Sequence, residues 1–397
     1  MPQPVAKLSK IEARKKISIL GATGTIGKNT IDIIEQHPEK YEIQALTAGQ
    51  NVDEIISIAR KLKPKFVAIQ DESQYSKLKS ALQNKNIDVG AGAGAIIEAA
   101  QIDCDLLMSG IVGVAALEPT IAAIKNGTNV ALANKECLVC AGKIIVEEAT
   151  KHNVQILPVD SEHNSLFQTF DFANPERIKK ITLTASGGPF HKISLNEMQN
   201  ISPEQAVRHP NWNMGAKISI DSATMMNKGL EVIEAYHLFP IEKDQIDVVI
   251  HPESVVHSLI SYIDGAVVAG LSNPDMKVPI AFALGWPERI PTSTKNLDLT
   301  EIGKLTFEKV DNQKFPALNL AKLALAADGS APTILNAANE IAVQSFLERK
   351  IQFLDIVKLV ENALQDIPHT KADSIEEILN IDKQTREFCL SFIKQGK

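Results

Sequence analysis

The sequence predicts three successive parts: an α/β domain with a doubly wound parallel sheet, a central α+β domain and a C-terminal helical domain. The chain has 397 residues, more than a single hydrophobic core usually organises. From residue 16 to about residue 159, short β-branched runs alternate with helical patterns, which is typical of parallel strands joined by right-handed crossovers. Beyond residue 315, apolar residues recur at helical spacing, and no convincing strand is seen.

The expected boundaries follow these changes in pattern. We predict domains at 1–159, 160–284 and 315–397, with 285–314 as a linker rich in Pro, Thr and Asn. In the first domain, the expected strands are 17–20, 42–46, 66–69, 106–109 and 129–133. In the central domain, they are 178–184, 247–250 and 266–269.

Composition and charge exclude several classes of protein. Hydrophobic residues make up 44% of the chain, and the formal net charge is -7, so no overall basic field would attract nucleic acid. No apolar run is long enough to cross a bilayer, and no apolar segment follows the basic residues near the start. The four cysteines are too few and too irregularly spaced for a disulfide framework. We expect a cytoplasmic protein with no nucleic-acid or membrane partner.

A glycine-rich turn, Gly21-Ala22-Thr23-Gly24-Thr25-Ile26-Gly27, separates the strand 17–20 from a helix expected to run to about Gln36. Glycines there let the backbone approach a pyrophosphate, whose charge the helix N-terminus favours. A purely structural turn is the alternative. The second strand ends without the Asp or Glu that usually holds the ribose of NAD. A Rossmann-like domain that prefers NADP is therefore predicted, although no Arg or Lys stands at that strand end either.

Two carboxylates, Asp160 and Glu162, follow the apolar run 155–159. In an extended segment, residues two apart point the same way, so both carboxylates would converge while Ser161 faces elsewhere. Because close like charges repel, a divalent cation between them would be stabilising, and oxygen ligands suit Mg²⁺ or Mn²⁺ better than Zn²⁺. A solvated acidic turn is the alternative.

A third polar group lies within 221–231. On a helix, Asn227 and Lys228 stand four and three residues before Glu231, so an amide, an ammonium and a carboxylate share one face. A surface helix could carry the same trio. The apolar flanks, which include Met225 and Met226, instead indicate partial enclosure and a need for polar partners.

A fourth group comprises 186–190 and 208–215. Ser186 and the two glycines after it offer a hydroxyl and backbone amides to an anion. Trp212 and Met214 are large apolar residues on a loop punctuated by Gly and Pro, which fits a lid over a ligand. A loop pinned to the surface by one aromatic side chain is the alternative.

Two other signals are interpreted as structural. Cys137 and Cys140 have redox or zinc spacing but lie in an apolar helical stretch, so we expect buried, inert thiols. His251 and His257 bracket an apolar run without metal-ligand partners nearby in sequence, so we expect structural histidines.

Taken in order, the motifs of the chain resemble those of the 1-deoxy-D-xylulose 5-phosphate reductoisomerase family. The matching segments are 21–27, 132–136, 158–164, 186–190, 209–215, 221–231, 251–257 and 335–340. The resemblance covers nearly the whole chain from Lys16. It implies a homodimeric enzyme that uses NADPH and a divalent metal to convert 1-deoxy-D-xylulose 5-phosphate to 2-C-methyl-D-erythritol 4-phosphate, through an aldehyde, in isoprenoid precursor synthesis.

The resemblance also assigns roles to residues around the metal and substrate. The metal ligands would be Asp160, Glu162 and Glu231, with the ion acting as a Lewis acid on the substrate's carbonyl and adjacent hydroxyl. Together with these three, His163 and Lys228 would form the catalytic set. The substrate phosphate would be held by Ser186, His209, Ser222 and Asn227. Other substrate oxygens would contact Ser161 and Lys228, under a cover formed by Trp212 and Met214.

The same resemblance assigns the NADPH site. The glycine-rich turn would contribute Gly21, Thr23, Gly24, Thr25, Ile26 and Gly27, with the pyrophosphate held by residues 24–26. The second strand end would contribute Gly49, Gln50 and Asn51. The nicotinamide side would be lined by Asn134, Lys135 and Glu136, and Gly215 completes the cofactor-binding set.

The chain departs from the family pattern at a few places. The family usually has Lys where Gln50 stands, which puts one contact to the adenosine 2′-phosphate in doubt. Cys137 replaces a common Ser, and either small side chain fits. The first fifteen or so residues have no evident counterpart, and we expect them to be disordered.

Two alternatives of different kinds stay open. Another NAD(P)-dependent dehydrogenase, of aldehyde or homoserine type, would need neither the three carboxylates nor the Trp212 loop. A non-catalytic dinucleotide-sensing protein would bind NADPH without turnover.

Overall fold

A computed structural model of the chain describes residues 14–83, 85–212 and 214–396. The expected disorder of the leading residues therefore lies outside the described residues as far as residue 13, while Lys15 already belongs to the first strand. Among the described residues, no helix combines the length and the apolar character needed to cross a bilayer.

The first sheet has seven parallel strands in the order β4-β3-β2-β1-β5-β6-β7. Their bounds are β1 Lys15–Leu20, β2 Tyr41–Ala48, β3 Phe66–Ile69, β4 Asp88–Ala91, β5 Leu106–Ser109, β6 Asn129–Leu132 and β7 Ile156–Pro158. The helices between them are α1 Thr25–Gln36, α2 Val52–Leu62, α3 Tyr75–Leu82, α4 Gly92–Gln101, α5 Leu117–Lys125 and α6 Lys135–Lys151. The five strands expected here are confirmed, whereas β4 and β7 were not predicted as strands.

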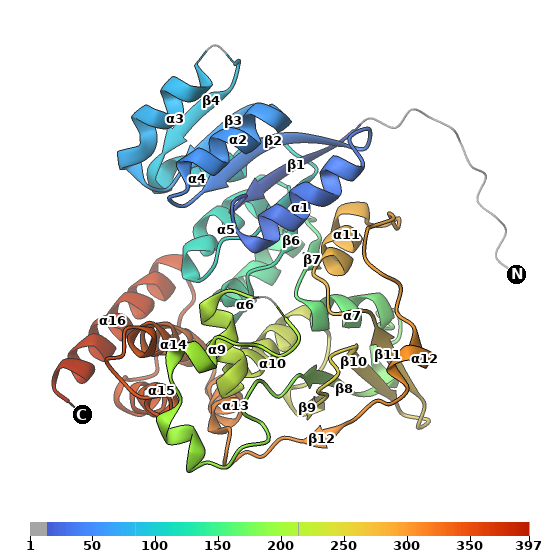
Figure 1. Ribbon diagram of the computed structural model, residues 1–397, viewed down its shortest axis with the longest axis vertical. Helices are drawn as coiled ribbons and strands as arrows, with labels where there is room; N and C mark the ends of the chain where they lie inside the picture. The colour runs from blue at the N-terminus through green and yellow to red at the C-terminus, as the bar shows by residue number, and fades with distance from the viewer. Residues whose placement is uncertain (1–13, 84, 213, 397) are drawn as a thin grey trace, which may run out of the picture.

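Helices cover both faces of this sheet because successive strand residues point to opposite sides. Ile19 joins a core with α1, α2 and α3, and the next residue, Leu20, joins a separate core with α4, α5 and α6. A later helix, α11 (Lys277–Gly285), packs against α1 and adds Ile280 to the first of these cores (Figure 1).

The glycine-rich turn lies where the strand order reverses between β1 and β5, which is the place where doubly wound sheets bind ligands. Gly21 has φ +78°, and a Cβ there would lie 2.8 Å from the carbonyl oxygen of Gly110 after β5. A Cβ at Gly27 would lie 2.4 Å from the carbonyl oxygen of Gly21. Both glycines are therefore needed for α1 to start this close to the sheet.

The second sheet is mixed and has the order β11-β10-β8-β9-β12. Its strands are β8 Ile178–Ala185, β9 Ile246–Ile250, β10 Val256–Tyr262, β11 Val267–Leu271 and β12 Glu308–Lys309. The strands β8 and β9 are parallel, and the other pairs are antiparallel. Neither β10 nor β12 was predicted, and β12 joins the expected linker to the edge of this sheet.

The remaining helices hold the second sheet and close the chain. They are α7 Ser161–Thr169, α8 Pro203–Ala206, α9 Ala216–Thr224, α10 Met226–Leu238, α12 Leu299–Ile302, α13 Pro316–Ala327, α14 Ala331–Leu347, α15 Asp355–Asp366 and α16 Ile375–Lys394. Short 3₁₀ turns are η1 Glu72–Gln74, η2 Val114–Ala116, η3 Pro175–Arg177, η4 Glu197–Asn200 and η5 Lys243–Gln245. The helical character expected beyond residue 315 is confirmed.

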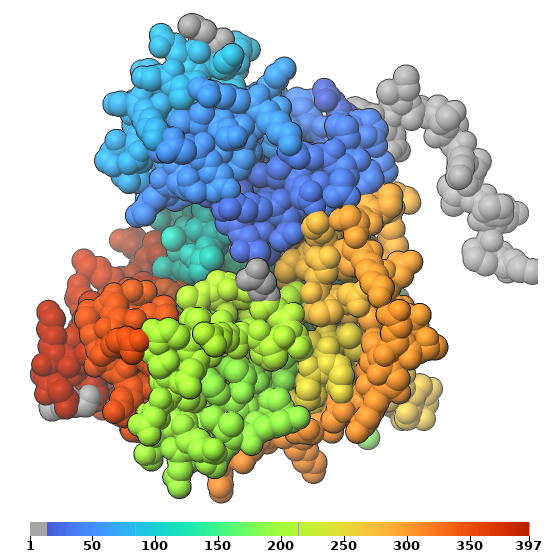
Figure 2. Space-filling view, viewed as in Figure 1, coloured from blue at the N-terminus to red at the C-terminus, as the bar shows by residue number. Residues whose placement is uncertain are grey.

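The C-terminal helices are fastened to the rest of the chain by α10 and α6. Helix α10 packs against α13 and α6, and α14 packs against α6 and α9. In Figure 2 the C-terminal region, in red, lies beside the green region that holds α9, and both lie below the blue first-sheet region. The predicted fold class is confirmed, and the exact domain boundaries stay a prediction.

Candidate active site

A cavity of about 400 Å³ opens at the carboxyl ends of β1, β5, β6 and β7, between the first sheet and the helices α9 and α10. Most of the predicted site residues line it: Gly24, Thr25, Ile26, Asn134, Lys135, Glu136, Asp160, Ser161, Glu162, Ser186, His209, Trp212, Met214, Gly215, Ser222, Asn227, Lys228 and Glu231. The predicted residues that do not line it are Gly21, Thr23, Gly27, Gly49, Gln50, Asn51 and His163. The cavity therefore unites the dinucleotide motif with the acidic groups.

Three carboxylates meet at the floor of this cavity. Asp160, Glu162 and Glu231 each place a carboxylate oxygen within 4.8 Å of the other two. The expectation that Asp160 and Glu162 converge in an extended segment was wrong about the backbone: Asp160 is the N-cap of α7, and Glu162 lies in the first helical turn. The predicted direction of Ser161 was also wrong, because its hydroxyl donates to Glu162 at 2.6 Å.

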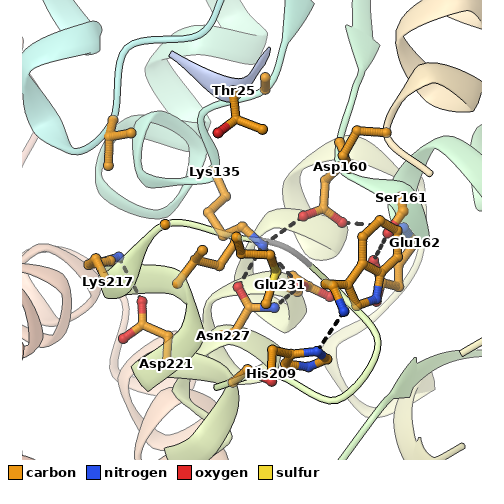
Figure 3. A pocket seen from close by; sticks show the side chains of 18 of the residues that line it. Thr25, Lys135, Asp160, Ser161, Glu162, His209, Lys217, Asp221, Asn227 and Glu231 are labelled. Atoms are coloured by element: carbon orange, nitrogen blue, oxygen red, sulfur yellow. Dashed lines mark hydrogen bonds and ion pairs between the residues drawn. The ribbon is translucent and has the colours of Figure 1, made fainter. Parts of the chain in front are cut away.

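Two lysines and an amide partner these carboxylates, and Figure 3 shows one of the lysines, Lys135, and the amide, Asn227. The Nζ of Lys135 lies 2.6 Å from Asp160 and 2.9 Å from both Asn227 and Glu231. The Nζ of Lys228 lies 2.7 Å from Glu162 and also donates to Glu231. Asn227 donates to Glu231 one turn along α10, as the helical spacing predicted.

The pKa values of these carboxylates reflect how close their negative charges lie to one another and to the lysines. Burial would raise the pKa of Asp160, but Lys135 and His163 hold it well below its usual value. Burial and the charges of Asp160 and Glu162 raise the pKa of Glu231 despite its lysine partners. Ionisation of Glu231 is therefore disfavoured by its surroundings, which a cation among the three carboxylates would relieve.

A second buried cluster lies behind the first. His163 is fully buried and places Nδ1 3.0 Å from Asp160 and 3.3 Å from Glu234, while Nε2 lies 2.9 Å from the carbonyl oxygen of Glu231. Burial raises the pKa of Glu234 to about 8. Burial would lower the pKa of His163, but Glu234 and Asp160 raise it to about 9. His163 thus contacts a predicted metal ligand from behind rather than lining the cavity.

Two neutral side chains, Ser186 and His209, also line the cavity. Ser186 at the end of β8 lies 2.9 Å from Nε2 of His209, and its hydroxyl accepts from the backbone of Gly188 at 3.1 Å. The Nδ1 of His209 accepts from the backbone amides of residues 211 and 212, so the proton of the neutral ring belongs on Nε2. Burial lowers the pKa of His209 to about 4, which favours this neutral form. Ser222 lines the same cavity, as does Asn227, which lies among the carboxylates.

Trp212 and Met214 line the cavity, and Asn211, just before Trp212, is held to the second sheet's side of it. Asn211 donates to the carbonyl oxygen of Pro252 at 2.6 Å and to Ser254 at 2.9 Å. The ring of Trp212 lies edge-on to His257, with centroids 6.3 Å apart. Asn213 lies outside the described residues.

The dinucleotide side is built around two helix N-termini. Gly24 is the N-cap of α1, and Asn134 is the N-cap of α6. Asn134 also donates to the carbonyl oxygens of Ile111 and Gly113 after β5. The predicted 2′-phosphate residues 49–51 are exposed at the end of β2, where Asn51 caps α2.

Comparisons with known proteins decide the family. Models of the reductoisomerase match residues 17–142 ("1-deoxy-D-xylulose 5-phosphate reductoisomerase"), 156–239 ("1-deoxy-D-xylulose 5-phosphate reductoisomerase C-terminal domain") and 271–388 ("DXP reductoisomerase C-terminal domain"). A 1-deoxy-D-xylulose 5-phosphate reductoisomerase from Rhodospirillum centenum is 49% identical over 383 residues, which cover 96% of this chain and 95% of that protein. The chain belongs to the 1-deoxy-D-xylulose 5-phosphate reductoisomerase family.

Other relatives of this reductoisomerase family agree. The enzyme from Chlorobaculum tepidum is 48% identical over 380 residues, covering 96% of this chain and all of that protein. The solved Zymomonas mobilis reductoisomerase, in complex with NADPH, superposes with a TM-score of 0.91 at 44% identity and covers 96% of this chain and 99% of its own. A solved reductoisomerase in complex with NADPH, fosmidomycin and magnesium superposes with a TM-score of 0.92 at 44% identity, covering 96% of this chain and 98% of its own. The recognition made from the motifs is confirmed.

Several groups at the site of this family member were missed from sequence. Lys217 and Asp221 line the cavity, as does His257, which was expected to be structural. Glu234 stands three residues after Glu231 on α10, a helical spacing that could have suggested it. Lys217 and Asp221 stand four residues apart on α9, a spacing that could have suggested their pairing, whereas the other partner of Lys217, Glu136, is 81 residues away in sequence. The thiols of Cys137 and Cys140 are buried and unpaired, as predicted.

Proposed function

We propose that the chain converts 1-deoxy-D-xylulose 5-phosphate to 2-C-methyl-D-erythritol 4-phosphate with NADPH and a divalent cation, in isoprenoid precursor synthesis. The observation that carries the proposal is the meeting of Asp160, Glu162 and Glu231 in one cavity with the dinucleotide turn. A relative solved in complex with NADPH, fosmidomycin and magnesium supports the choice of NADPH and a divalent cation. Family membership favours neither the dehydrogenase nor the sensor alternative.

The donor set fits Mg²⁺ or Mn²⁺. Asp160, Glu162 and Glu231 offer only oxygen atoms, as these ions prefer. Lys135 and Lys228 contact these three carboxylates, and His163 contacts Asp160 from behind. A divalent cation bound there would supply Lewis acidity toward the substrate's carbonyl and hydroxyl oxygens. The positive charge added to the cavity floor would suit a phosphorylated substrate.

The residues of the chain have separate tasks in this proposal. Ser186, His209, Ser222 and Asn227 hold the phosphate through neutral hydrogen bonds, with His209 donating from Nε2. Lys228 and Ser161 contact the substrate's other oxygens. His163 keeps Asp160 in place from behind, because its Nδ1 lies 3.0 Å from that carboxylate.

On the cofactor side, Gly24, Thr25 and Ile26 offer the N-terminus of α1 to the pyrophosphate. Asn134, Lys135 and Glu136 line the nicotinamide side. Trp212 and Met214 exclude water while the hydride moves. The strand end at 49–51 receives the adenosine 2′-phosphate.

The test is an assay of NADPH oxidation by the purified chain with 1-deoxy-D-xylulose 5-phosphate. We expect turnover that depends on added Mg²⁺ or Mn²⁺ and stops with a chelator. NADPH binding without turnover would favour a sensor, and turnover of aldehyde substrates without metal would favour a dehydrogenase.

We also propose that the protein is a homodimer. Strand β11 lies at the edge of the second sheet, and its turn and strand expose Ile263, Val267, Val268 and Leu271. An exposed apolar edge strand is a ready surface for a second copy of the chain. Light scattering should give twice the mass of the chain, and Val267→Lys should give a monomer. A wild-type monomer would contradict the proposal.

We further propose a cytoplasmic location. All four cysteines are buried and unpaired, which fits a reducing compartment. Fractionation of cells that express the untagged chain should recover it with cytoplasmic markers, and recovery with secreted proteins would contradict this.

A further inference from the structure

Lys217 joins three parts of the chain at the edge of the cavity. It is the second residue of α9, directly after the segment that carries Trp212 and Met214. Its Nζ lies 2.8 Å from Glu136, in the first turn of α6, and 2.8 Å from Asp221, one turn further along α9. Figure 3 shows Lys217 and Asp221 paired away from the carboxylates of the metal floor.

The two carboxylate partners of Lys217 are buried, so their negative charges need the ammonium group of Lys217 to compensate them. The side chains of Glu136 and Asp221 are 7% and 1% exposed. A buried carboxylate without a cation is strongly unfavourable, and two close together are more so. Lys217 is therefore held between Glu136 of the first domain and Asp221 of the substrate side.

The carboxylate of Asp221 is itself held by a residue of the C-terminal helices. Its second carboxylate oxygen accepts a hydrogen bond of 2.8 Å from Nδ2 of Asn339, on α14. Because a carboxylate only accepts, the NH₂ group of Asn339 must be the one that faces it. Asn339 is fully buried and does not line the cavity. This contact gives a physical role to the motif at 335–340, which no part of the proposed reaction uses.

We propose that Lys217 is a positioning residue that anchors the covering segment to the NADPH-binding wall, and that Asn339 supports it through Asp221. Glu136 and the start of α9 then move as one body, so Met214 and Gly215, which directly precede α9, are held at the wall that binds the dinucleotide. The inference rests on the proposed function for the identity of that dinucleotide. Under this proposal, the position of the covering segment depends on the C-terminal helices as well as on the substrate.

Three substitutions separate this role from general damage. Lys217→Met removes the ammonium and keeps the aliphatic stem. Asn339→Leu removes the amide that holds Asp221 while leaving Lys217 paired. The matched control is Asn336→Leu, because Asn336 is equally buried on the same helix but donates to Glu340.

Two readouts need no turnover. One is the dissociation constant for NADPH from the fluorescence of the bound nicotinamide. The other is acrylamide quenching of Trp212, made specific by Trp286→Phe because the chain has only two tryptophans. Both remain measurable if the chain proves inactive on 1-deoxy-D-xylulose 5-phosphate, so failure of the proposed function is distinguishable from failure of this inference.

We expect Lys217→Met to weaken NADPH binding roughly tenfold, within the range of coupling carried by buried polar networks, and to increase quenching of Trp212. Asn339→Leu should give smaller changes of the same sign, and Asn336→Leu should change neither readout. The double variant should be no worse than Lys217→Met alone, because Asn339 acts through Lys217. Lys217→Arg should retain NADPH affinity.

The inference is overturned if Asn336→Leu matches Asn339→Leu, if the two effects add fully in the double variant, or if Lys217→Met leaves both readouts unchanged. Should Lys217→Met not fold, Asn339→Leu against Asn336→Leu decides the question alone.

Discussion

Replacing Glu231 with Gln isolates the charge at the centre of the proposed metal site. The side chain is 1% exposed and accepts from Lys135, Asn227 and Lys228. Burial and the neighbouring carboxylates raise its pKa, so the ionised form is disfavoured when no cation is present. The metal-free variant should therefore unfold at the same temperature as the parent or at a higher one, although it has lost an ion pair.

The expected difference between the parent and the variant is the rise in Tm when metal is added. At a concentration one hundred times the dissociation constant, a ligand stabilises the native state by about 2.7 kcal/mol. Proteins unfold with an entropy of about 2.1 cal/mol/K per residue, so for 397 residues this corresponds to a rise in Tm of roughly 3 °C. If the loss of one ligand weakens binding about hundredfold, the same metal concentration stabilises Glu231→Gln by only about 0.4 kcal/mol, or less than ~1 °C.

Thermal unfolding with and without Mn²⁺ measures both expectations, with Glu147→Gln as a control because Glu147 is an exposed glutamate on α6. In the NADPH oxidation assay, kcat of Glu231→Gln should fall roughly 10³-fold, since several kcal/mol of Lewis-acid stabilisation is lost, while NADPH affinity is unchanged. A parent-like metal shift or full activity would refute the reasoning.

Three further outcomes are expected. Ser222→Ala should mainly raise KM for the phosphorylated substrate, and an unchanged KM would remove Ser222 from the phosphate site. Gln50→Lys should lower the dissociation constant for NADPH, measured by fluorescence, and no change would mean that another group binds the 2′-phosphate. Burial lowers the pKa of His209, His237 and His257 to about 4 from 6.5. The unfolded chain then binds more protons at these histidines, which lowers the free energy of unfolding as pH drops from about 6.5 to 4, by up to ~1.4 kcal/mol per pH unit for each histidine. The raised pKa of Glu234, about 8, acts in the opposite direction and offsets one of the three, so a net fall is expected. A Tm that stays level over this range would contradict the assignment.

Local features of the site could be predicted because they depend on residues close in sequence. The turn after β1 needs glycine at 21 and 27, and the trio on α10 follows from helical spacing. The convergence of Asp160 and Glu162 was predicted for the wrong reason, because an Asp after a strand can also cap a helix. The strands β4, β7, β10 and β12 were missed because Gly or polar residues interrupt them, or because they have three residues or fewer, so none shows a clear apolar run.

Long-range contacts could not be predicted from a single sequence. The family resemblance places Lys135 at the nicotinamide side, and the docking of α10 against α6 also brings its Nζ to Glu231, 96 residues away, a contact that the sequence did not indicate. His257 belongs to β10, whose place beside β8 turns it toward the cavity. In the same way, Asn339 reaches Asp221 only after α14 packs on α9. Such contacts are set by tertiary packing and leave no local pattern.

A crystal structure of the chain grown with Mn²⁺, with an anomalous difference map, tests whether the three carboxylates bind one metal ion. We expect one strong peak within ligand distance of Asp160, Glu162 and Glu231. A peak at another site, or none at these carboxylates at saturating Mn²⁺, would contradict the account.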